Sequence, residues 1–239
     1  MNTQVPRQAM VLAAGLGLRM RPLTNNLPKP LVLLNGKSLL DRVLDHLIEI
    51  GVKRVAINLH YLGKMIEHHL KTRVKPEIEF SYEVDCLLET GGGVAKALKF
   101  FGASPFYVVN TDIAWKNGKI PALKRLAEFW ENGRMDALLL LHPVSSANGY
   151  NGIGDYNRTK NGNLHRRTNE QSMPFVFTGI QILHPRLFAR APAGPFSLTS
   201  LYDEAEGNNR LFGIIHDGEW CHLGSIVALR EAEKISKGL

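Results

Sequence analysis

A short apolar run that ends in glycines constrains this chain more than any other feature. Residues 10–14 read Met-Val-Leu-Ala-Ala, the length of a buried strand, and Gly15, Gly17, Arg19 and Arg21 follow. Glycine lets a backbone turn tightly and approach a ligand, and the N–H groups of such a turn suit phosphate oxygens. Arginine can bind phosphate through two N–H groups at once. The pattern predicts a strand followed by a binding loop for a nucleoside triphosphate.

A lysine between two prolines adds a further positive charge to this loop. Lys29 lies between Pro28 and Pro30, and proline restricts the backbone on both sides of it. The spacing excludes two common phosphate-binding motifs. The P-loop requires a Gly-Lys-Ser/Thr end that this stretch lacks, and the dinucleotide fingerprint requires a glycine where Met20 stands.

Length and charge limit the class of protein. The chain has 239 residues, of which 44% are hydrophobic, as expected for one globular domain. Neither a signal peptide nor an apolar run of the ~18 residues needed to span a membrane is expected. The formal net charge is +7, but the basic residues are scattered, and a polyanionic small substrate explains the excess. We expect a monomer or small homo-oligomer with no nucleic-acid or membrane partner.

The two cysteines, Cys86 and Cys221, form no metal-binding or disulfide pattern. Free thiols of this kind are usually buried, so we expect both to lie in the interior. Unpaired cysteines are typical of a reducing compartment, and the sequence therefore predicts a cytoplasmic protein.

Strand and helix patterns alternate along the chain. Such alternation predicts an α/β fold with a doubly wound, Rossmann-like sheet. The expected strands cover residues 8–14, 54–58, 77–82, 105–109, 135–141, 163–168, 175–183, 210–215 and 220–224. The expected helices cover residues 39–50, 62–70, 94–101, 119–132 and 226–235, the first of them capped by Ser38.

Two stretches beyond the first loop are candidates for binding. Residues 87–93 read Leu-Leu-Glu-Thr-Gly-Gly-Gly before an expected helix, where the backbone can approach a ligand; a flexible hinge is the alternative. Asp112 follows the expected strand 105–109, and ligands of open α/β sheets bind beyond the carboxyl ends of strands. A carboxylate there is a suitable ligand for Mg²⁺, and a turn after the strand is the alternative.

The string L-A-A-G-x-G-x-R-M-R-P-L-T, followed by P-K-P-L, closely resembles the signature of the sugar-1-phosphate nucleotidylyltransferases. The resemblance covers nearly the whole chain and is strongest in residues 9–36, 87–98, 104–114 and 175–188. It implies the nucleotide-diphosphosugar transferase fold, a three-layer α/β sandwich with a mostly parallel mixed central sheet. The whole chain, 1–239, would then be one domain with a nucleotide-binding half over about 1–115 and a sugar-binding half over about 116–239.

The resemblance also implies an activity. A sugar 1-phosphate oxygen would attack the α-phosphorus of a nucleoside triphosphate in line, and pyrophosphate would leave. Catalysis of this kind rests on positioning and charge stabilisation, and the attacking phosphate needs no general base. Within the family, the chain resembles the N-acetylmuramate α-1-phosphate uridylyltransferases of peptidoglycan recycling and also the mannose-1-phosphate guanylyltransferases. Its short length favours the first group, with UTP as the nucleotide.

Individual roles follow from the same resemblance. Arg19 would bind the β- and γ-phosphates, Lys29 the α-phosphate and the attacking phosphate, and Asp112 the Mg²⁺ ion, with Mn²⁺ as a second possibility. The nucleotide would lie on Leu12, Ala13, Ala14, Gly15, Gly17, Arg19, Lys29, Glu89, Thr90 and Gly91. The sugar would lie on Asn110, Asp155, Arg166, Arg167, Thr178 and Gly179. The two arginines suit the lactyl carboxylate of N-acetylmuramate, and a solvated turn is the alternative.

One departure from the family pattern concerns the metal. The last strand of the family commonly ends Asp-[Val/Ile]-Gly-Thr-Pro, whose aspartate is a second Mg²⁺ ligand, whereas this chain has His222 there. Imidazole suits softer divalent ions than magnesium, so His222 is a weak metal ligand, a hydrogen-bond donor that faces the phosphates, or a bystander. A nucleotide-sugar-binding regulator without turnover therefore stays open as an alternative. A nicotinamide-type Rossmann protein is the third possible function, but Met20 in place of a glycine and the presence of Lys29 argue against it.

Overall fold

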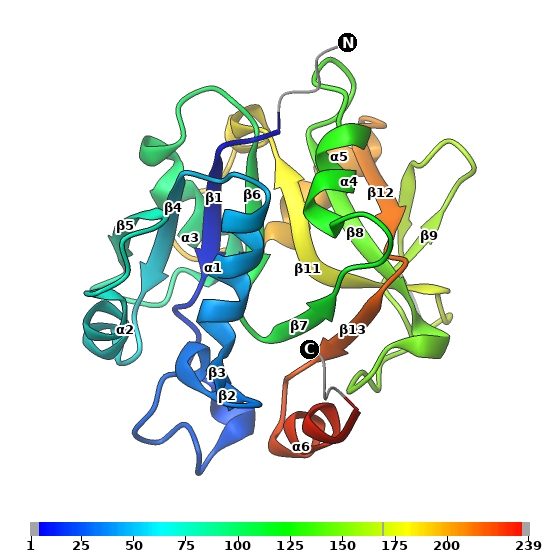
Figure 1. Cartoon of the computed structure of the whole chain (residues 1–239). Helices are drawn as coiled ribbons and strands as arrows, with labels where there is room; N and C mark the ends of the chain where they lie inside the picture. The colour runs from blue at the N-terminus through cyan, green and yellow to red at the C-terminus, as the bar shows by residue number, and fades with distance from the viewer. Residues whose placement is uncertain (1–4, 169, 236–239) are drawn as a thin grey trace.

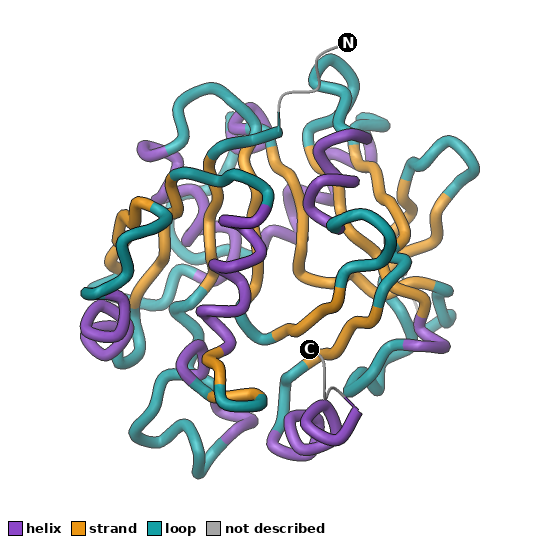
Figure 2. The backbone as a smooth tube through the Cα atoms, viewed as in Figure 1, coloured by secondary structure: helices purple, strands orange, loops and turns teal. Residues whose placement is uncertain are grey.

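The computed structural model describes residues 5–168 and 170–235 as one mixed nine-stranded sheet with helices on both faces, shown in Figures 1 and 2. Its parallel part runs in the order β6-β1-β4-β5. These strands are β1 (Gln8–Leu12), β4 (Arg54–Leu59), β5 (Glu77–Tyr82) and β6 (Phe106–Asn110). The central position of β1 explains its apolar run, because a strand with neighbours on both sides and helices on both faces is buried throughout.

The other part of the sheet is mainly antiparallel. Here β11 (Phe175–Leu183) pairs with β6 and with β8 (Ala137–Pro143), and β8 pairs in parallel with β12 (Leu211–Ile215). The short strands β9 (Tyr156–Arg158) and β10 (Leu164–Arg166) extend this edge. A register shift between Phe177 and Gln181 interrupts the β11–β8 pairing at Gly179. This irregularity lies next to the end of β6, where the site is built.

Helices cover both faces of the sheet and complete the expected three layers. The sheet separates two hydrophobic cores, and alternate residues of β1 belong to one or the other. Ala9 and Val11 belong to the core with α1, α2 and α4, whereas Met10 belongs to the core with α3 and α5. Figure 1 shows α1 crossing in front of β1. The helices are α1 (Leu39–Glu49), α2 (Gly63–Leu70), α3 (Glu89–Ala97), α4 (Ala122–Phe129), α5 (Leu198–Gly207) and α6 (Ile226–Ile235). No helix in the described part has both the length and the apolar content needed to cross a membrane.

Local sequence signals account for the start of α1. Asn35 and Gly36 both have positive φ and form the turn between β2 (Leu33–Leu34) and β3 (Lys37–Ser38). The Ser38 hydroxyl then accepts a hydrogen bond from the Asp41 backbone N–H at 3.0 Å, which caps the helix as expected.

Some expected elements were wrong in extent or missing. The helix placed at residues 94–101 begins at Glu89, so its three glycines lie inside α3, and the helix placed at 119–132 covers only Ala122–Phe129. The sequence did not predict α5, nor the strand β7 (Ile113–Lys116), which pairs with β13 (Glu219–His222) in a separate two-stranded sheet. Cys221 is buried as expected, but Cys86 is exposed because it lies in the loop between β5 and α3.

Candidate active site

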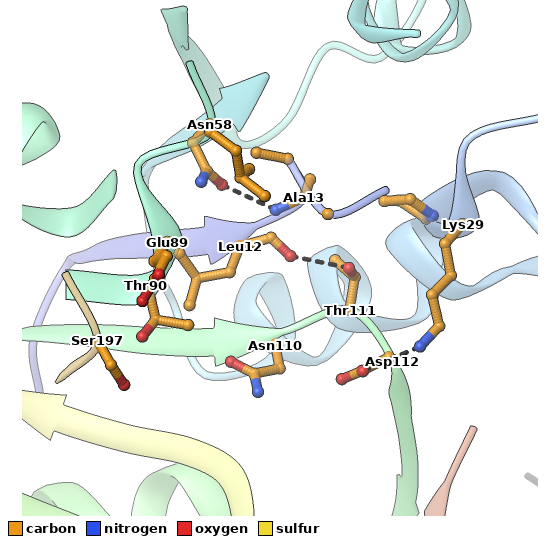
Figure 3. Close-up of a pocket in the computed structure, with 14 residues that line it drawn as sticks. Leu12, Ala13, Lys29, Asn58, Glu89, Thr90, Asn110, Thr111, Asp112 and Ser197 are labelled. Atoms are coloured by element: carbon orange, nitrogen blue, oxygen red, sulfur yellow. Dashed lines mark hydrogen bonds and ion pairs between the residues drawn. The ribbon is translucent and has the colours of Figure 1, made fainter. Parts of the chain in front are cut away.

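A cavity of about 390 Å³ lies at the carboxyl ends of β1 and β6, and the start of α3 forms its opposite wall (Figure 3). The end of a parallel sheet is where ligands of this fold class bind. Residues predicted as site residues line most of it, namely Leu12, Ala13, Ala14, Gly15, Lys29, Glu89, Thr90, Asn110 and Asp112. The structure adds Asn58, Thr111 and Ser197, among others, which the sequence analysis missed.

The backbone after β1 is partly occupied by the protein itself. The Thr111 hydroxyl donates a hydrogen bond to the Leu12 carbonyl at 2.8 Å, and the Ala13 N–H donates to Asn58 Oδ1 at 2.8 Å. The Ala13 N–H is therefore not free for a ligand in this structure, although Ala13 itself lines the cavity. Within the described residues, the N–H groups of Ala14 and Gly15 have no protein partner, and these two are available to a nucleotide.

The glycine–arginine segment forms a folded loop beside the cavity. Gly17 has φ +64°, and a Cβ there would lie 3.2 Å from Thr24, whose hydroxyl donates to the Gly17 carbonyl at 2.7 Å. The three-residue 3₁₀ helix Leu18–Met20 carries Arg19, which is exposed. Neither Gly17 nor Arg19 lines the cavity. Gly17 shapes the loop, and Arg19 contributes positive charge from the rim.

Lys29 and Asp112 form an ion pair at the end of the cavity. Lys29 begins the 3₁₀ helix Lys29–Leu31, and its Nζ lies 2.9 Å from Asp112 Oδ2, with side chains 11% and 29% exposed. Burial alone would raise the pKa of Asp112. The charge and hydrogen bond of Lys29, with the charge of Arg19, outweigh it and lower that pKa below its usual value. Asp112 is therefore held ionised.

The pairing of β13 with β7 brings His222 to the same place. His222 Nε2 lies 3.9 Å from Asp112 Oδ2. Burial, the largest effect, together with the charges of Lys29 and Arg19 outweighs the opposing charge of Asp112 and lowers the pKa of His222, which favours the neutral imidazole, the form that can bind a metal. Among the described residues, no group of three or more acidic, histidine or cysteine side chains is placed to hold a metal ion. The donor set nevertheless fits Mg²⁺, which one carboxylate and substrate phosphates can hold.

The glycines of α3 allow close packing against another segment. The Gly91 and Gly92 N–H groups donate to the Phe196 carbonyl at 2.8 and 3.2 Å, and a Cβ on Gly91 would lie 2.3 Å from the Phe196 ring. The Thr90 hydroxyl accepts from the Leu198 N–H at 2.9 Å. The Gly91 N–H is therefore occupied by Phe196 and Gly91 does not line the cavity, so its contact with the nucleotide stays a prediction. Glu89 and Thr90 do line the cavity.

On the sugar side, Asn110 and Gly179 meet at the irregular part of β11. Gly179 has φ +82°, and a Cβ there would lie 2.9 Å from Asn110 Nδ2. Thr178, in contrast, is fully buried, and its hydroxyl donates to the Leu140 carbonyl at 2.8 Å. Its own carbonyl accepts a hydrogen bond from Trp220 Nε1 at 3.1 Å. The hydroxyl and the carbonyl of Thr178 thus both face the core, and its contact with the sugar stays a prediction.

The other three expected sugar residues lie outside the cavity. Asp155 Oδ2 accepts from the Phe177 N–H at 2.8 Å, and burial raises its pKa. Arg166 is ion-paired with Asp203 on α5, with Nη2–Oδ2 at 2.8 Å. Arg167 Nε donates to the Gly154 carbonyl at 3.0 Å. Because Arg166 and Asp155 are engaged within the protein, the expectation of an arginine pair presented to a lactyl carboxylate was wrong for this arrangement.

Two of the missed residues differ in how they could have been found. Asn58 lies near the end of an expected strand, so the rule about carboxyl ends could have singled it out. Ser197 carries no local signal, because only the packing of the segment before α5 on α3 brings it to the cavity.

Comparison with known proteins agrees with this geometry. Residues 8–237 match the family described as Nucleotidyl transferase. The chain is 38% identical to an N-acetylmuramate alpha-1-phosphate uridylyltransferase of Caulobacter vibrioides over 97% of both chains, and 32% identical to one of Neisseria meningitidis over 96% of this chain and 98% of the other. A mannose-1-phosphate guanylyltransferase catalytic subunit beta of Drosophila melanogaster is 29% identical, over 91% of this chain and 59% of its own.

Solved structures show the same fold. A UDP-glucose pyrophosphorylase complexed with UDP-glucose superimposes with a TM-score of 0.76 at 18% identity, over 96% of this chain and 97% of the other. A putative glucose-1-phosphate thymidylyltransferase of Bacillus anthracis superimposes with a TM-score of 0.78 at 18% identity, over 97% and 96%. From the match over nearly all its length and the site at the end of its parallel strands, the chain belongs to the nucleotidyl transferase family and is a sugar-1-phosphate nucleotidylyltransferase.

Proposed function

We propose that this enzyme transfers a uridylyl group from UTP to N-acetylmuramate 1-phosphate and releases pyrophosphate. The observation that carries the proposal is the Lys29–Asp112 pair at the end of a cavity whose other walls are the backbone after β1 and the start of α3. Such a cavity offers a polar edge for a base and paired charges for phosphates. The choice of UTP and of N-acetylmuramate rests on the two relatives above 30% identity.

The proposed pose assigns each wall to a part of the substrate. The free N–H groups of Ala14 and Gly15, with Glu89 and Thr90 opposite, face the base and ribose. The phosphates extend toward Lys29. Residues about 1–115 thus form the nucleotide half, and Asn110 with Gly179 marks its border with a sugar half over about 116–239.

Lys29 and Arg19 have separate parts in the chemistry. An oxygen of the sugar phosphate attacks the α-phosphorus, a new P–O bond forms, and the bond to the β-phosphate oxygen breaks. Lys29, fixed between prolines, stabilises charge on the α-phosphate as it shifts. Arg19, exposed at the rim, binds the departing β- and γ-phosphates. The attacking oxygen is already anionic, so no side chain must remove a proton.

Asp112 is the proposed protein ligand of Mg²⁺, with His222 as a weaker second contact that also suits Mn²⁺. The ion would neutralise phosphate charge and orient the two reacting phosphates. Asp112 supplies the ionised oxygen that this role needs. A cytoplasmic location and a monomer or small homo-oligomer remain part of the same proposal.

Pyrophosphate release is the direct test. The enzyme with Mg²⁺ would be supplied with UTP or GTP and with the 1-phosphates of N-acetylmuramate, N-acetylglucosamine, glucose and mannose. We expect the highest kcat/KM for UTP with N-acetylmuramate 1-phosphate. Preference for GTP with mannose 1-phosphate would replace the proposal with a guanylyltransferase. Tight nucleotide binding without release in any combination would indicate a regulator.

A further inference from the structure

A buried chain of three hydrogen bonds connects the two walls of the nucleotide cavity. The Ala13 N–H donates to Asn58 Oδ1 at 2.8 Å, Asn58 Nδ2 donates to Glu83 Oε1 at 2.7 Å, and the Leu88 N–H donates to Glu83 Oε2 at 2.7 Å. Ala13 belongs to the wall formed by the backbone after β1. Leu88 caps α3 directly before Glu89, and so belongs to the opposite wall. Figure 3 shows the Asn58–Ala13 end of this chain.

This hydrogen-bond chain lies in the interior of the protein, away from solvent. Asn58 and Glu83 are 3% and 2% exposed. Gly93 of α3 leaves room for both, since a Cβ there would lie 2.9 Å from Asn58 Nδ2 and from Glu83 Oε1. Within the described residues, no cation pairs with the Glu83 carboxylate, which is satisfied by N–H donors alone. A buried carboxylate without a cation is costly unless it has a specific task.

The two ends of this hydrogen-bond chain determine which atoms along it must donate and which must accept. Both terminal groups are backbone N–H donors, so each must meet an acceptor. Among amides and ionised carboxylates, two side chains can join two donors only if one is a carboxylate, which accepts at both oxygens, and the other is an amide, which accepts at one end and donates at the other. The pair Asn58–Glu83 meets this requirement. Two amides would oppose two donors somewhere in the hydrogen-bond chain, and two ionised carboxylates would oppose two acceptors.

We propose that Asn58 and Glu83 are positioning residues that set the spacing between the two walls and thereby the affinity for the nucleotide. By occupying the Ala13 N–H, Asn58 leaves the Ala14 and Gly15 N–H groups as the free donors of the wall after β1. By holding Leu88, Glu83 fixes the start of α3 and with it Glu89 and Thr90. This inference rests on the proposed use of the cavity for UTP.

Exchanging amides and carboxylates tests the hydrogen-bond chain without changing the size of the two side chains. Glu83→Gln makes two amides, and Asn58→Asp makes two carboxylates. The double variant Asn58→Asp/Glu83→Gln restores one of each in reversed order, so that every donor again meets an acceptor. We expect each single variant to raise the Kd and KM for UTP about tenfold or more, because a buried polar group is left unpaired. We expect the double variant to return within about threefold of the wild type.

The readout separates positioning from a merely structural role. A structural role would lower Tm and the active fraction, and hence the apparent kcat, but leave the Kd for UTP of the folded protein unchanged. Positioning predicts a rise in Kd and KM for UTP with the KM for the sugar 1-phosphate nearly unchanged. Glu79→Gln lies on strand β5, which ends directly before Glu83, and outside the cavity; it is the matched control and should resemble the wild type.

Three results would overturn the inference: an unchanged Kd for UTP in Glu83→Gln, a double variant as weak as the weaker single variant, or a rise in both KM values together. If neither single variant folds, the double variant is compared with the wild type directly. A Kd for UTP more than about tenfold above the wild type would then overturn it. Failure of the proposed function is distinguishable, because the wild type itself would then neither bind UTP nor release pyrophosphate from it.

Discussion

Lys29 Nζ and Asp112 Oδ2 lie 2.9 Å apart although 83 residues of chain separate them. One side chain comes from the loop after β1, and the other from the turn after β6. Their contact places a fixed cation and a fixed anion at one end of the cavity. Lys29 lowers the pKa of Asp112 and so stabilises its charged form, which is the form that metal binding requires.

Replacing Lys29 tests its proposed action on the shifting charge of the reaction. Loss of one preorganised donor typically lowers kcat by about 10²–10³, or roughly 3–4 kcal/mol. We expect Lys29→Ala to fold, to keep most of its affinity for UTP and to lose turnover on that scale. Steady-state kinetics and UTP binding measure both effects. Lys116→Ala, which changes an exposed lysine of β7, is the control, and a loss of tenfold or less in Lys29→Ala would contradict the assigned role.

The metal site predicts unequal effects of its two side chains. Asp112→Asn should lower Mg²⁺-dependent kcat/KM by at least about 100-fold, since metal stabilisation amounts to several kcal/mol. His222→Ala should be milder, because its Nε2 lies 3.9 Å from the carboxylate and imidazole is a poor ligand for Mg²⁺. Activity in Mg²⁺, Mn²⁺ and Co²⁺ measures this. Identical activities of wild type and His222→Ala in all three metals would identify His222 as a bystander.

Because Arg166 forms an ion pair with Asp203, we predict that Arg166 does not discriminate between sugar substrates. We expect Arg166→Ala to leave the ratio of kcat/KM for N-acetylmuramate 1-phosphate over N-acetylglucosamine 1-phosphate unchanged within about twofold, since any effect on the fold acts on both substrates equally. A selective loss of about tenfold or more for the muramate substrate would show that the arginine exchanges Asp203 for the lactyl carboxylate.

The close packing of Gly91 on Phe196 predicts a large cost for one added methyl group. A Cβ at Gly91 would lie 2.3 Å from the Phe196 ring and 2.8 Å from its carbonyl oxygen. We expect Gly91→Ala to lower the free energy of unfolding by about 1–3 kcal/mol, as overpacking does. Urea denaturation measures it. Gly133→Ala is the control, because a Cβ there meets nothing within 4 Å; equal stabilities of the two variants would contradict the packing argument.

His216 predicts a pH dependence of stability. Burial, mainly, lowers the pKa of His216 from 6.5 to about 4, so the folded state keeps the ring neutral where the unfolded chain binds a proton. Stability is therefore complete above pH 6.5 and falls as the pH drops toward 4, by up to about 3 kcal/mol. His216→Gln should show a shallower decline between these values. Urea unfolding of both proteins from pH 8 to 4 measures the difference, and parallel curves would contradict it.

The sequence by itself determined the features that local chemistry controls. The apolar run of β1 and its glycines fixed a buried strand with a loop at its end, and Asn35-Gly36 with Ser38 fixed a turn and a helix start. The bounds of β11 and α6 also follow from apolar periodicity alone. Because Lys29 and Asp112 each follow a recognisable local pattern, both could be placed in the site without knowledge of their contact.

Only the tertiary structure decided which backbone groups stay free for a ligand. The Ala13 N–H is taken by Asn58, which lies 45 residues away, and the Gly91 N–H by Phe196. The three glycines of α3 have low helix propensity, so the sequence favours a loop. Close packing of Gly91 and Gly92 on the segment before α5, and of Gly93 on Asn58 and Glu83, nevertheless requires glycine inside the helix. Thr178 and Arg166 likewise bond to partners that are distant in sequence and that no local pattern reveals. Thr178 donates to the buried Leu140 carbonyl, and Arg166 pairs with the charged Asp203 carboxylate.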